Sequence, residues 1–300
     1  MHLVIEHFKV CGCRRFRIYQ ILLLAIGFMT FPIACSEASE DVVSTPLRIV
    51  SFSPALTRTL EDLGLSESIV GCTPFCRPHQ QDAAVVGDLR EINYEILARL
   101  QPTHILVQAT TSGIQPKLQA LAETRGWQIG VWPTDDLQDI RTLLAELPEL
   151  LGGTGQSQSN TLLAAIDEIG TKRRSWSGRT LVVTGGQPLL GFGPQTYMGE
   201  LLDRFGVPNA LESGDWMNLS LEDVVRLRPQ AIIVIGSQEG QAAATIRALA
   251  RDEVFAAPVV VLDHPEALVP SSRVIEVSVA LANLIDELGS KNEQTSMSYE

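Results

Sequence analysis

The stretch YEILARLQPTHILV, Tyr94 to Val107, decides the fold, because LEDVVRLRPQAIIV, Leu221 to Val234, repeats its pattern. Each copy follows a residue that favours a helix N-cap, Asn93 in one and Ser220 in the other. About two helical turns come next, and a proline then stops the helix before an apolar, β-branched run that is typical of a buried strand. The repeat therefore predicts a short helix, a break and a core strand twice, and so two similar lobes rather than a solenoid.

Strands and helices alternate around both repeat units. LRIVSF (residues 47–52) is typical of a buried strand, and it leads into Ser53 as a helix N-cap with Pro54 at the first helical position. TLVVTG (residues 180–185) is a second such strand, followed by a glycine-rich loop and a helix. This alternation predicts an α/β fold with two Rossmann-like lobes, whose parallel sheets are joined by a single long rigid helix.

The length of the chain, 300 residues, suits two domains of ordinary size. A polar segment after Gly152 and Gly153, with an apolar stripe at helical spacing, predicts the helix between the lobes. The predicted division is a signal peptide at 1–34, a linker at 35–46, an N-terminal lobe at 47–152, an inter-lobe helix at 153–177, a C-terminal lobe at 178–289 and a disordered tail at 290–300.

The first residues have the features of an export signal. Basic residues from Lys9 to Arg17 precede the apolar run Ile18–Ala34, which is marginal for a membrane span of about 20 residues. Ile33-Ala34-Cys35 resembles the end of a bacterial lipoprotein signal, although Pro32 departs from the usual leucine. We therefore expect lipidation of Cys35, with ordinary cleavage nearby or a retained N-terminal anchor as the alternatives.

Charge and cysteine usage narrow the class of protein. The formal net charge is −12, and removal of residues 1–34 makes it about −15. No basic cluster remains to neutralise phosphates or to bind anionic lipid, so we expect no nucleic-acid partner. Cys72 and Cys76 would remain in the exported chain, either as a disulfide or as two unpaired thiols.

The sequence shows no catalytic constellation. It contains no G-x-S-x-G elbow, no H-E-x-x-H pair and no P-loop, so we expect no enzyme activity. Cys72, Cys76 and His79 lack a fourth ligand, and we predict no metal site. GFGPQ (residues 191–195) is interpreted as a turn that lets backbone approach a ligand, with a plain tight turn as the alternative. His264 follows a strand at its carboxyl end, where it either contacts ligand or faces solvent.

Glu95 and Glu222 occupy the same position in the two repeat helices. A carboxylate in the first turn stabilises a helix by about 0.3–1 kcal/mol, which alone could account for both residues. A pair of exposed carboxylates, one on each lobe, would also suit recognition of a basic partner in a fixed register.

From Leu47 to about Leu288 the chain resembles the periplasmic binding proteins of ABC importers for vitamin B12 and ferric siderophores, the class with two α/β lobes joined by one rigid helix. The resemblance covers about four fifths of the chain. It rests on these segments in this order: RIVSFSPALTRTLEDLGL, VGCTPFC, VGDLREINYEILARLQPTHILV, GPQTYMGELLDRFGVPNAL and DWMNLSLEDVVRLRPQAIIV.

The resemblance implies a non-enzymatic protein of the periplasm or cell envelope, anchored through Cys35. It would bind a small-molecule metal chelate between its lobes, use no cofactor, act as a monomer and deliver its ligand to an ABC permease in the inner membrane. Glu95 and Glu222 match the positions that dock with the permease. The candidate ligand-binding residues are Ser53, Pro54, Phe75, Phe192, Tyr197, Trp216 and His264.

Two departures affect the ligand more than the fold. Where B12 binders have tryptophans, this chain has GDL (residues 87–89) and QATTSG (residues 108–113). Arg77 and Arg90 are the nearby basic residues that could meet an anionic siderophore. We expect a corrinoid or another metal chelate as ligand. The alternatives are a ferric-siderophore or haem-binding protein of the same family, a two-lobed chelatase-like enzyme, and a lipoprotein that senses or scavenges without a transporter.

Overall fold

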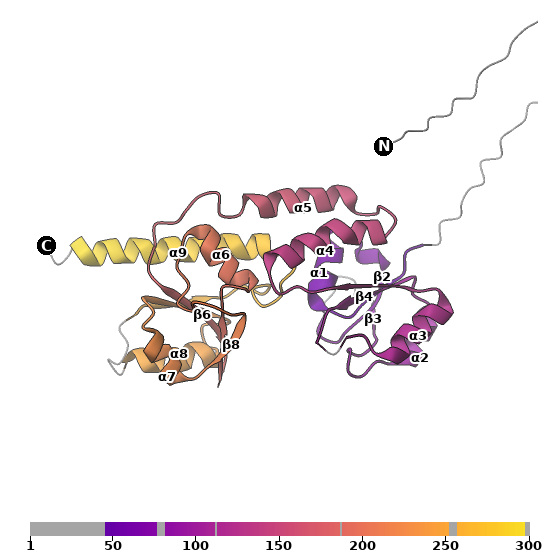
Figure 1. Cartoon of the computed structure of the whole chain (residues 1–300), viewed down its shortest axis with the longest axis horizontal. Helices are drawn as coiled ribbons and strands as arrows, with labels where there is room; N and C mark the ends of the chain where they lie inside the picture. The colour runs from indigo at the N-terminus through magenta and orange to yellow at the C-terminus, as the bar shows by residue number, and fades with distance from the viewer. Residues whose placement is uncertain (1–45, 77–81, 112, 187, 252–256, 298–300) are drawn as a thin grey trace, which may run out of the picture. The chain divides into compact units, whose positions relative to one another are not determined.

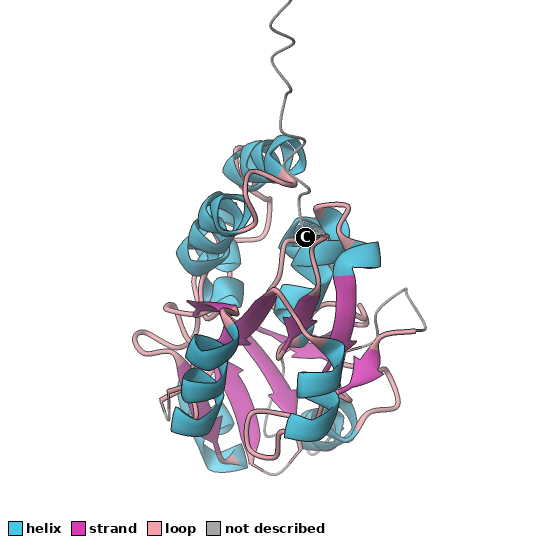
Figure 2. Ribbon diagram, turned by 90° about the vertical axis from the view of Figure 1, so that its right-hand side faces the viewer, coloured by secondary structure: helices cyan, strands magenta, loops and turns pink. Residues whose placement is uncertain are grey.

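The structure is a computed structural model that describes residues 46–76, 82–111, 113–186, 188–251 and 257–297 of the 300-residue chain. Residues Thr45–Glu300 belong to one compact unit, which contains two five-stranded sheets. Helices lie on both sides of the strands (Figure 2). The α/β class and the division into two mostly parallel sheets are as the sequence predicts.

The first sheet has the strand order β3-β2-β1-β4-β5, and every neighbouring pair in it is parallel. Its strands are β1 (Ile49–Ser51), β2 (Ile69–Cys72), β3 (Ala84–Val85), β4 (His104–Gln108) and β5 (Gln128–Trp132). We call this sheet and its helices the first lobe. Those helices are α1 (Pro54–Asp62), the 3₁₀ turn η1 (Ser66–Ser68), α2 (Tyr94–Leu100), α3 (Pro116–Arg125) and α4 (Leu137–Leu150).

Alternation along the first-lobe strands assigns the helices to two faces. Ile49 and Leu106 are buried in the same cluster as residues of α1 and α4. Val50 and Ile105 are buried with Leu97 of α2 and with residues of α3. Because successive side chains of a strand point to opposite faces, α1 and α4 cover one face and α2 and α3 cover the other.

The second sheet has the order β10-β9-β6-β7-β8. We call it and its helices the second lobe. Its strands are β6 (Thr180–Gly185), β7 (Leu189–Phe192), β8 (Trp216–Leu219), β9 (Ala231–Ile235) and β10 (Val259–Leu262), and its helices are α6 (Tyr197–Phe205), α7 (Leu221–Leu227), α8 (Gln241–Arg251) and α9 (Val274–Met297).

Two strands of the second sheet correct the prediction. β10, β9 and β6 are parallel, but β7 is antiparallel to β6 and β8 is antiparallel to β7. Part of the predicted glycine-rich loop is therefore strand β7. Gly185 has φ of 86°, so the chain turns back at once and the apolar residues Leu189–Phe192 pair with the end of β6.

The helix between the two sheets is shorter than predicted. α5 runs from Gln156 to Glu168, instead of 153–177, and it packs beside α4 (Figure 1). Gly155, with φ of 84°, precedes its first residue. Gly170 follows its end with φ of 80°, and a Cβ there would lie 2.5 Å from the Cβ of Arg204. A left-handed glycine against a neighbouring helix ends α5 early.

The last helix is longer than predicted. α9 continues to Met297, whereas the sequence analysis places a disordered tail from residue 290. No proline or glycine follows Gly289, so nothing in the local sequence stops the helix there.

The repeat has the predicted structure in both copies. α2 and β4 form one unit, α7 and β9 the other, and each helix has seven residues. Asn93 Oδ1 accepts from Ile96 N at 3.0 Å, and Ser220 Oγ accepts from Asp223 N at 3.2 Å. Each helix ends in a left-handed residue, Gln101 or Arg228, which directly precedes the proline.

Candidate functional site

The carboxyl ends of the first-lobe strands are joined by a chain of polar side chains. Ser53 is the N-cap of α1, and its Oγ donates to Gln108 Oε1 at 2.7 Å. Gln108 Nε2, at the end of β4, donates to Thr134 Oγ1 at 2.8 Å, just beyond β5. Ser53 and Thr134 are buried, while Gln108 and Pro54 are half-buried. In open α/β sheets ligands bind at this edge, so Gln108 and Pro54 are placed to meet one.

Phe75 lies in the segment that follows β2, at the same edge. Its side chain is 67% exposed, an unusual state for a phenylalanine without a partner. The nearby cysteines are both buried free thiols, and Thr57 Oγ1 lies 3.1 Å from Cys76 Sγ. The structure thus presents an apolar ring to solvent above a buried polar cluster.

Three aromatic candidates from the second lobe come together. The ring of Phe192 lies 4.5 Å from that of Trp216 and 6.0 Å from that of Tyr197, between centroids. Phe192 and Tyr197 are buried, and Tyr197 Oη donates to the carbonyl of Ala267. Burial raises the pKa of Tyr197 well above its usual range. These two rings pack behind the half-buried Trp216 and hold it in place, and their direct contact with a ligand stays a prediction.

The glycine-rich turn beside these rings has a structural explanation. Gly193 N donates to Asp215 O at 2.8 Å, and a Cβ at Gly193 would lie 2.3 Å from Gly214 O. Gly193 therefore allows close approach of the backbone at Gly214 and Asp215, which belong to the same chain. The structure therefore favours the tight-turn alternative for GFGPQ, and the approach of its backbone to a ligand stays a prediction.

His264 follows β10 and is half-buried. Its Nδ1 accepts from Glu266 N at 3.2 Å, which orients the ring within its own turn. Leu268, four residues further, is 51% exposed. Leu268 could not be predicted as a candidate contact, because a single leucine in a loop gives no periodic signal.

Carboxylates surround the connection from β5 to α4. Tyr197 N donates to Asp135 O at 2.8 Å, and Leu137 N donates to Glu200 Oε2 at 3.0 Å, so α6 lies against this connection. Burial, then repulsion from Asp139, Asp136 and Asp215, raises the pKa of the Asp135 carboxyl. Burial is also the main cause that raises the pKa of Glu200, with Asp136 and Asp139 adding to it. The region is therefore mainly acidic, with Arg204 as an opposing charge near Glu200.

Glu95 and Glu222 are both exposed in the first turn of their helices. Glu95 Oε1 forms an ion pair with Arg99 at 2.8 Å. In the second copy Arg226 pairs with Asp223 instead, and no ion pair within the described residues involves Glu222. The two carboxylates have the same backbone position but different partners.

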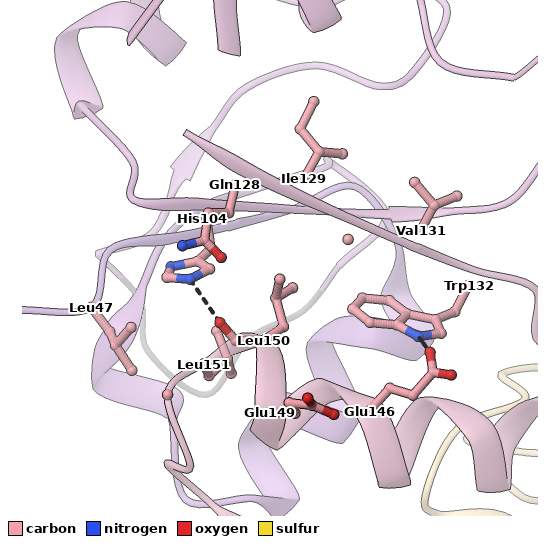
Figure 3. A pocket seen from close by; sticks show the side chains of 12 residues that line it. Leu47, His104, Gln128, Ile129, Val131, Trp132, Glu146, Glu149, Leu150 and Leu151 are labelled. Carbon is pink, nitrogen blue, oxygen red and sulfur yellow. Dashed lines mark hydrogen bonds between the residues drawn. The ribbon is translucent and has the colours of Figure 1, made fainter. Parts of the chain in front are cut away.

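A groove of about 800 Å³ lies along β5 and the last turns of α4 (Figure 3). Trp132 Nε1 donates to Glu146 Oε2 at 2.8 Å on its wall, and His104 Nε2 lies 3.1 Å from Leu150 O at its end. Burial lowers the pKa of His104, as suits the structural histidine that its place in a core strand indicates. A second hollow, of about 610 Å³, lies beside Asp88, Glu91 and Tyr94.

Several predicted features lie outside the described residues. They are the signal peptide 1–34, the lipidation site Cys35, the linker up to residue 45, and Arg77. None of the described helices has the length and apolar character needed to cross a membrane. Within the described ranges, no group of three histidine, cysteine, aspartate or glutamate side chains is arranged to hold a metal ion.

Comparison with known proteins assigns the family. The chain belongs to the periplasmic binding protein family, which matches residues 49–257. It is 26% identical over 209 residues to the vitamin B12-binding protein of Pectobacterium carotovorum, covering 65% of this chain and 73% of that one. It is 24% identical over 227 residues to the high-affinity heme uptake system protein IsdE of Staphylococcus aureus, covering 71% and 74%.

The fold is also that of a solved member of the class. The periplasmic heme-binding protein HutB of Vibrio cholerae superimposes with a TM-score of 0.66 at 20% identity, over 80% of this chain and 99% of that one. Members of the family are periplasmic transport proteins rather than enzymes. They bind small-molecule chelates for delivery to ABC permeases, and they use no cofactor of their own.

Proposed function

We propose that this chain captures a corrinoid, or another metal chelate without net negative charge, between its two lobes and delivers it to an ABC permease. The observation that carries the choice of ligand is the combination of apolar side chains after β2 and β10 and at the start of β8 with acidic side chains around the β5–α4 connection. Similarity to a B12-binding protein supports the same choice.

The apolar contribution comes from both sheets. Phe75 is 67% exposed and Leu268 is 51% exposed, and Trp216 is half-buried against Phe192. A corrin ring offers a broad flat surface with an apolar rim, which aromatic and aliphatic side chains bind well. Gln108 and His264 would add hydrogen bonds to its amide substituents.

The charge contribution decides between ligand types. Burial, then the charges of Asp139, Asp136 and Asp215, raises the pKa of Asp135. Burial, then Asp136 and Asp139, raises the pKa of Glu200 although Arg204 opposes this. Haem carries two carboxylates and many ferric siderophores are anionic, so this acidic region would oppose both. A neutral or cationic corrinoid carries no such penalty.

Haem is the second candidate, because the Staphylococcus relative and the Vibrio structure are both named for it. Calorimetric titration of residues 36–300 with cyanocobalamin, cobinamide, haem and a ferric siderophore distinguishes the candidates. We expect sub-micromolar, one-to-one binding of a corrinoid. Binding of haem alone would overturn the choice of ligand, and silence toward all four would overturn the proposal.

Two substitutions test the proposed contacts. Trp216→Ala and Leu268→Ala should each weaken corrinoid binding about tenfold, which corresponds to about 1.4 kcal/mol. Val279→Ala is a matched control, because Val279 is a similarly exposed aliphatic residue on α9. Equal affinities for all three variants would place the ligand elsewhere.

A further inference from the structure

Two thiols at the carboxyl end of β2 have no role in the proposed capture of ligand. Cys72 is the last residue of β2, and Cys76 follows after a turn in which Cys76 N donates to Thr73 O at 3.2 Å. The Cys76 side chain is 7% exposed and that of Cys72 is 2% exposed. The turn folds the four-residue spacing back, so that both buried free thiols lie at the carboxyl end of β2. The effect of each thiol on the pKa of the other agrees with this closeness.

The surroundings of the two sulfurs differ. Thr57 Oγ1 lies 3.1 Å from Cys76 Sγ, and Thr73 Oγ1 lies 3.2 Å from it. The hydrogen bond from the Cys72 thiol, and after it those from the two threonines, lower the pKa of Cys76 to about 6 although burial opposes this. The same pairing, with burial, raises the pKa of Cys72. Near neutral pH an attacking thiolate therefore lies next to a protonated thiol.

Thr57 connects Cys76 to the ligand-facing edge of the first sheet. Its hydroxyl also lies 2.9 Å from Ser51 Oγ and 2.9 Å from the carbonyl of Ser53. Ser53 in turn bonds Gln108. Any displacement of the Cys76 sulfur changes its contact with Thr57 in the first turn of α1. Thr57 contacts Ser53, which is part of the polar edge of the sheet.

We propose that Cys72 and Cys76 form a reversible thiol–disulfide pair, whose oxidation loosens the first turn of α1. Cys76 is the attacking sulfur, because it is the more exposed of the two and accepts more hydrogen bonds. Its thiolate attacks a disulfide RSSR, forms a mixed disulfide and releases RS⁻. Cys72 then loses its proton, attacks the Cys76 sulfur and releases the second RS⁻.

The electrons and atoms of this exchange balance. Two protein thiols and one RSSR become one protein disulfide and two RSH, and two electrons pass from the protein to RSSR. A small-molecule disulfide such as oxidised glutathione is sufficient as the oxidant. The new bond draws Cys76 Sγ toward Cys72 and away from the Thr57 hydroxyl.

The test uses residues 36–300, which retain the compact unit Thr45–Glu300 and contain no cysteine besides this pair. The native protein is treated with oxidised glutathione, blocked with N-ethylmaleimide and weighed intact. We expect loss of both free thiols and of two hydrogens in mass, with no glutathione retained, and full reversal by dithiothreitol. In Cys72→Ser a glutathione adduct should persist at Cys76, whereas Cys76→Ser should stay unmodified.

Hydrogen exchange measures the second half of the proposal. The amides of residues 55–58 should exchange several-fold faster in the oxidised protein than in the reduced one, while those of α7 should be unchanged. Two retained glutathiones, no reaction, or an adduct on Cys76→Ser would overturn the assignment of the pair. Equal exchange in both states would overturn its effect on α1. None of these measurements uses a ligand, so their outcome is separate from that of the titrations above.

Discussion

At the scale of single residues, Gln101 and Arg228 hold the same conformation at the same place in the two repeat units. Their φ angles are 45° and 46°, in the left-handed region. For a residue with a Cβ this region costs about 1–2 kcal/mol. Both side chains are exposed, so each position serves the backbone turn more than any side-chain contact.

Replacing either residue by glycine should therefore stabilise the protein. We expect Gln101→Gly and Arg228→Gly each to raise the free energy of unfolding by about 0.5–1 kcal/mol, because glycine adopts this conformation without strain but has more freedom when unfolded. Urea unfolding measures the change, and the double variant should show the sum. Alanine at the same positions is the control and should give no gain; a gain with alanine as large as with glycine would contradict the explanation.

The Asp135 carboxyl gives a pH-dependent prediction. Its pKa in the folded protein is raised, first by burial and then by Asp139, Asp136 and Asp215. A carboxyl with a raised folded pKa destabilises the fold above that pKa and ceases to do so once it is protonated. Asp135→Asn should thus stabilise the protein at pH 7 by about 0.5 kcal/mol, the size of partly exposed charge interactions.

The gain from Asp135→Asn should fall toward zero as the pH is lowered below the ordinary aspartate pKa, because both side chains are then neutral. Unfolding curves at pH 7 and pH 3 measure this difference. A stabilisation that is the same at both pH values would indicate a packing effect instead of relief of repulsion.

The sequence predicts residues whose role depends on near neighbours. Asn93 and Ser220 cap helices through hydrogen bonds to the residue three positions later, so the local sequence is enough to identify them. Gln108 and Thr134 were not predicted as site residues. Their hydrogen bond depends on the order of the strands, and a single polar residue in the sequence does not indicate that order.

At the scale of elements, α2 and α7 present Glu95 and Glu222 from equivalent first turns. Both carboxylates are exposed, and neither is needed to cap its helix, since Asn93 and Ser220 do so. Each carboxylate stabilises its helix through the dipole, and Glu95 also pairs with Arg99. Because both are exposed and do not cap their helices, they are also suited to pairing with a basic partner.

If the two carboxylates dock the protein to its ABC permease, as we propose, reversing their charges should weaken that binding. We expect Glu95→Arg and Glu222→Arg each to lower the affinity for permease-containing vesicles at least tenfold, and the double variant to abolish binding, with ligand affinity unchanged. Glu123→Arg is the matched control, an exposed glutamate on α3. If Glu123→Arg has the same effect, or if uptake survives the double reversal, docking through these helices is wrong.

Elements with strong periodic patterns were predictable, and those without them were not. β1, β4, β6 and β9 each contain a buried run of apolar, mostly β-branched residues, which is why their parallel pairing could be predicted. β7 contains Gly191 and follows a glycine turn, so its sequence favours a loop, and its pairing with β6 becomes visible only in the fold.

At the scale of the whole molecule, a buried ion cluster joins α1 of the first lobe to the segment before α9. Arg273 donates to Asp62 Oδ1 at 3.2 Å, to Glu61 Oε2 at 2.9 Å and to Glu266 Oε1 at 3.4 Å. Arg58 reaches Glu61 and Glu266 from α1 at 3.1 and 3.2 Å. About two hundred residues separate the two sides of the cluster, so no local pattern predicts it.

Removing Arg273 leaves carboxylates that the fold has already taken out of water. The Arg273 and Glu266 side chains are 15% and 9% exposed, and that of Glu61 is 4% exposed. Loss of one partner from a buried ion pair costs about 3–5 kcal/mol. Arg58 still pairs with Glu61 and Glu266 after Arg273 is removed, so the cost here should lie at the lower end of that range. Arg273→Met should therefore lower the free energy of unfolding by about 3 kcal/mol in urea.

Two further variants separate this explanation from a loss of packing. Arg273→Lys keeps the charge but not the planar fork, and it should cost clearly less than Arg273→Met. Arg226→Met removes an exposed arginine, 78% exposed in its ion pair, and should change stability by less than about 0.5 kcal/mol. If Arg273→Lys is as unstable as Arg273→Met, geometry outweighs charge. If Arg273→Met is no worse than Arg226→Met, the cluster does not hold the lobes together.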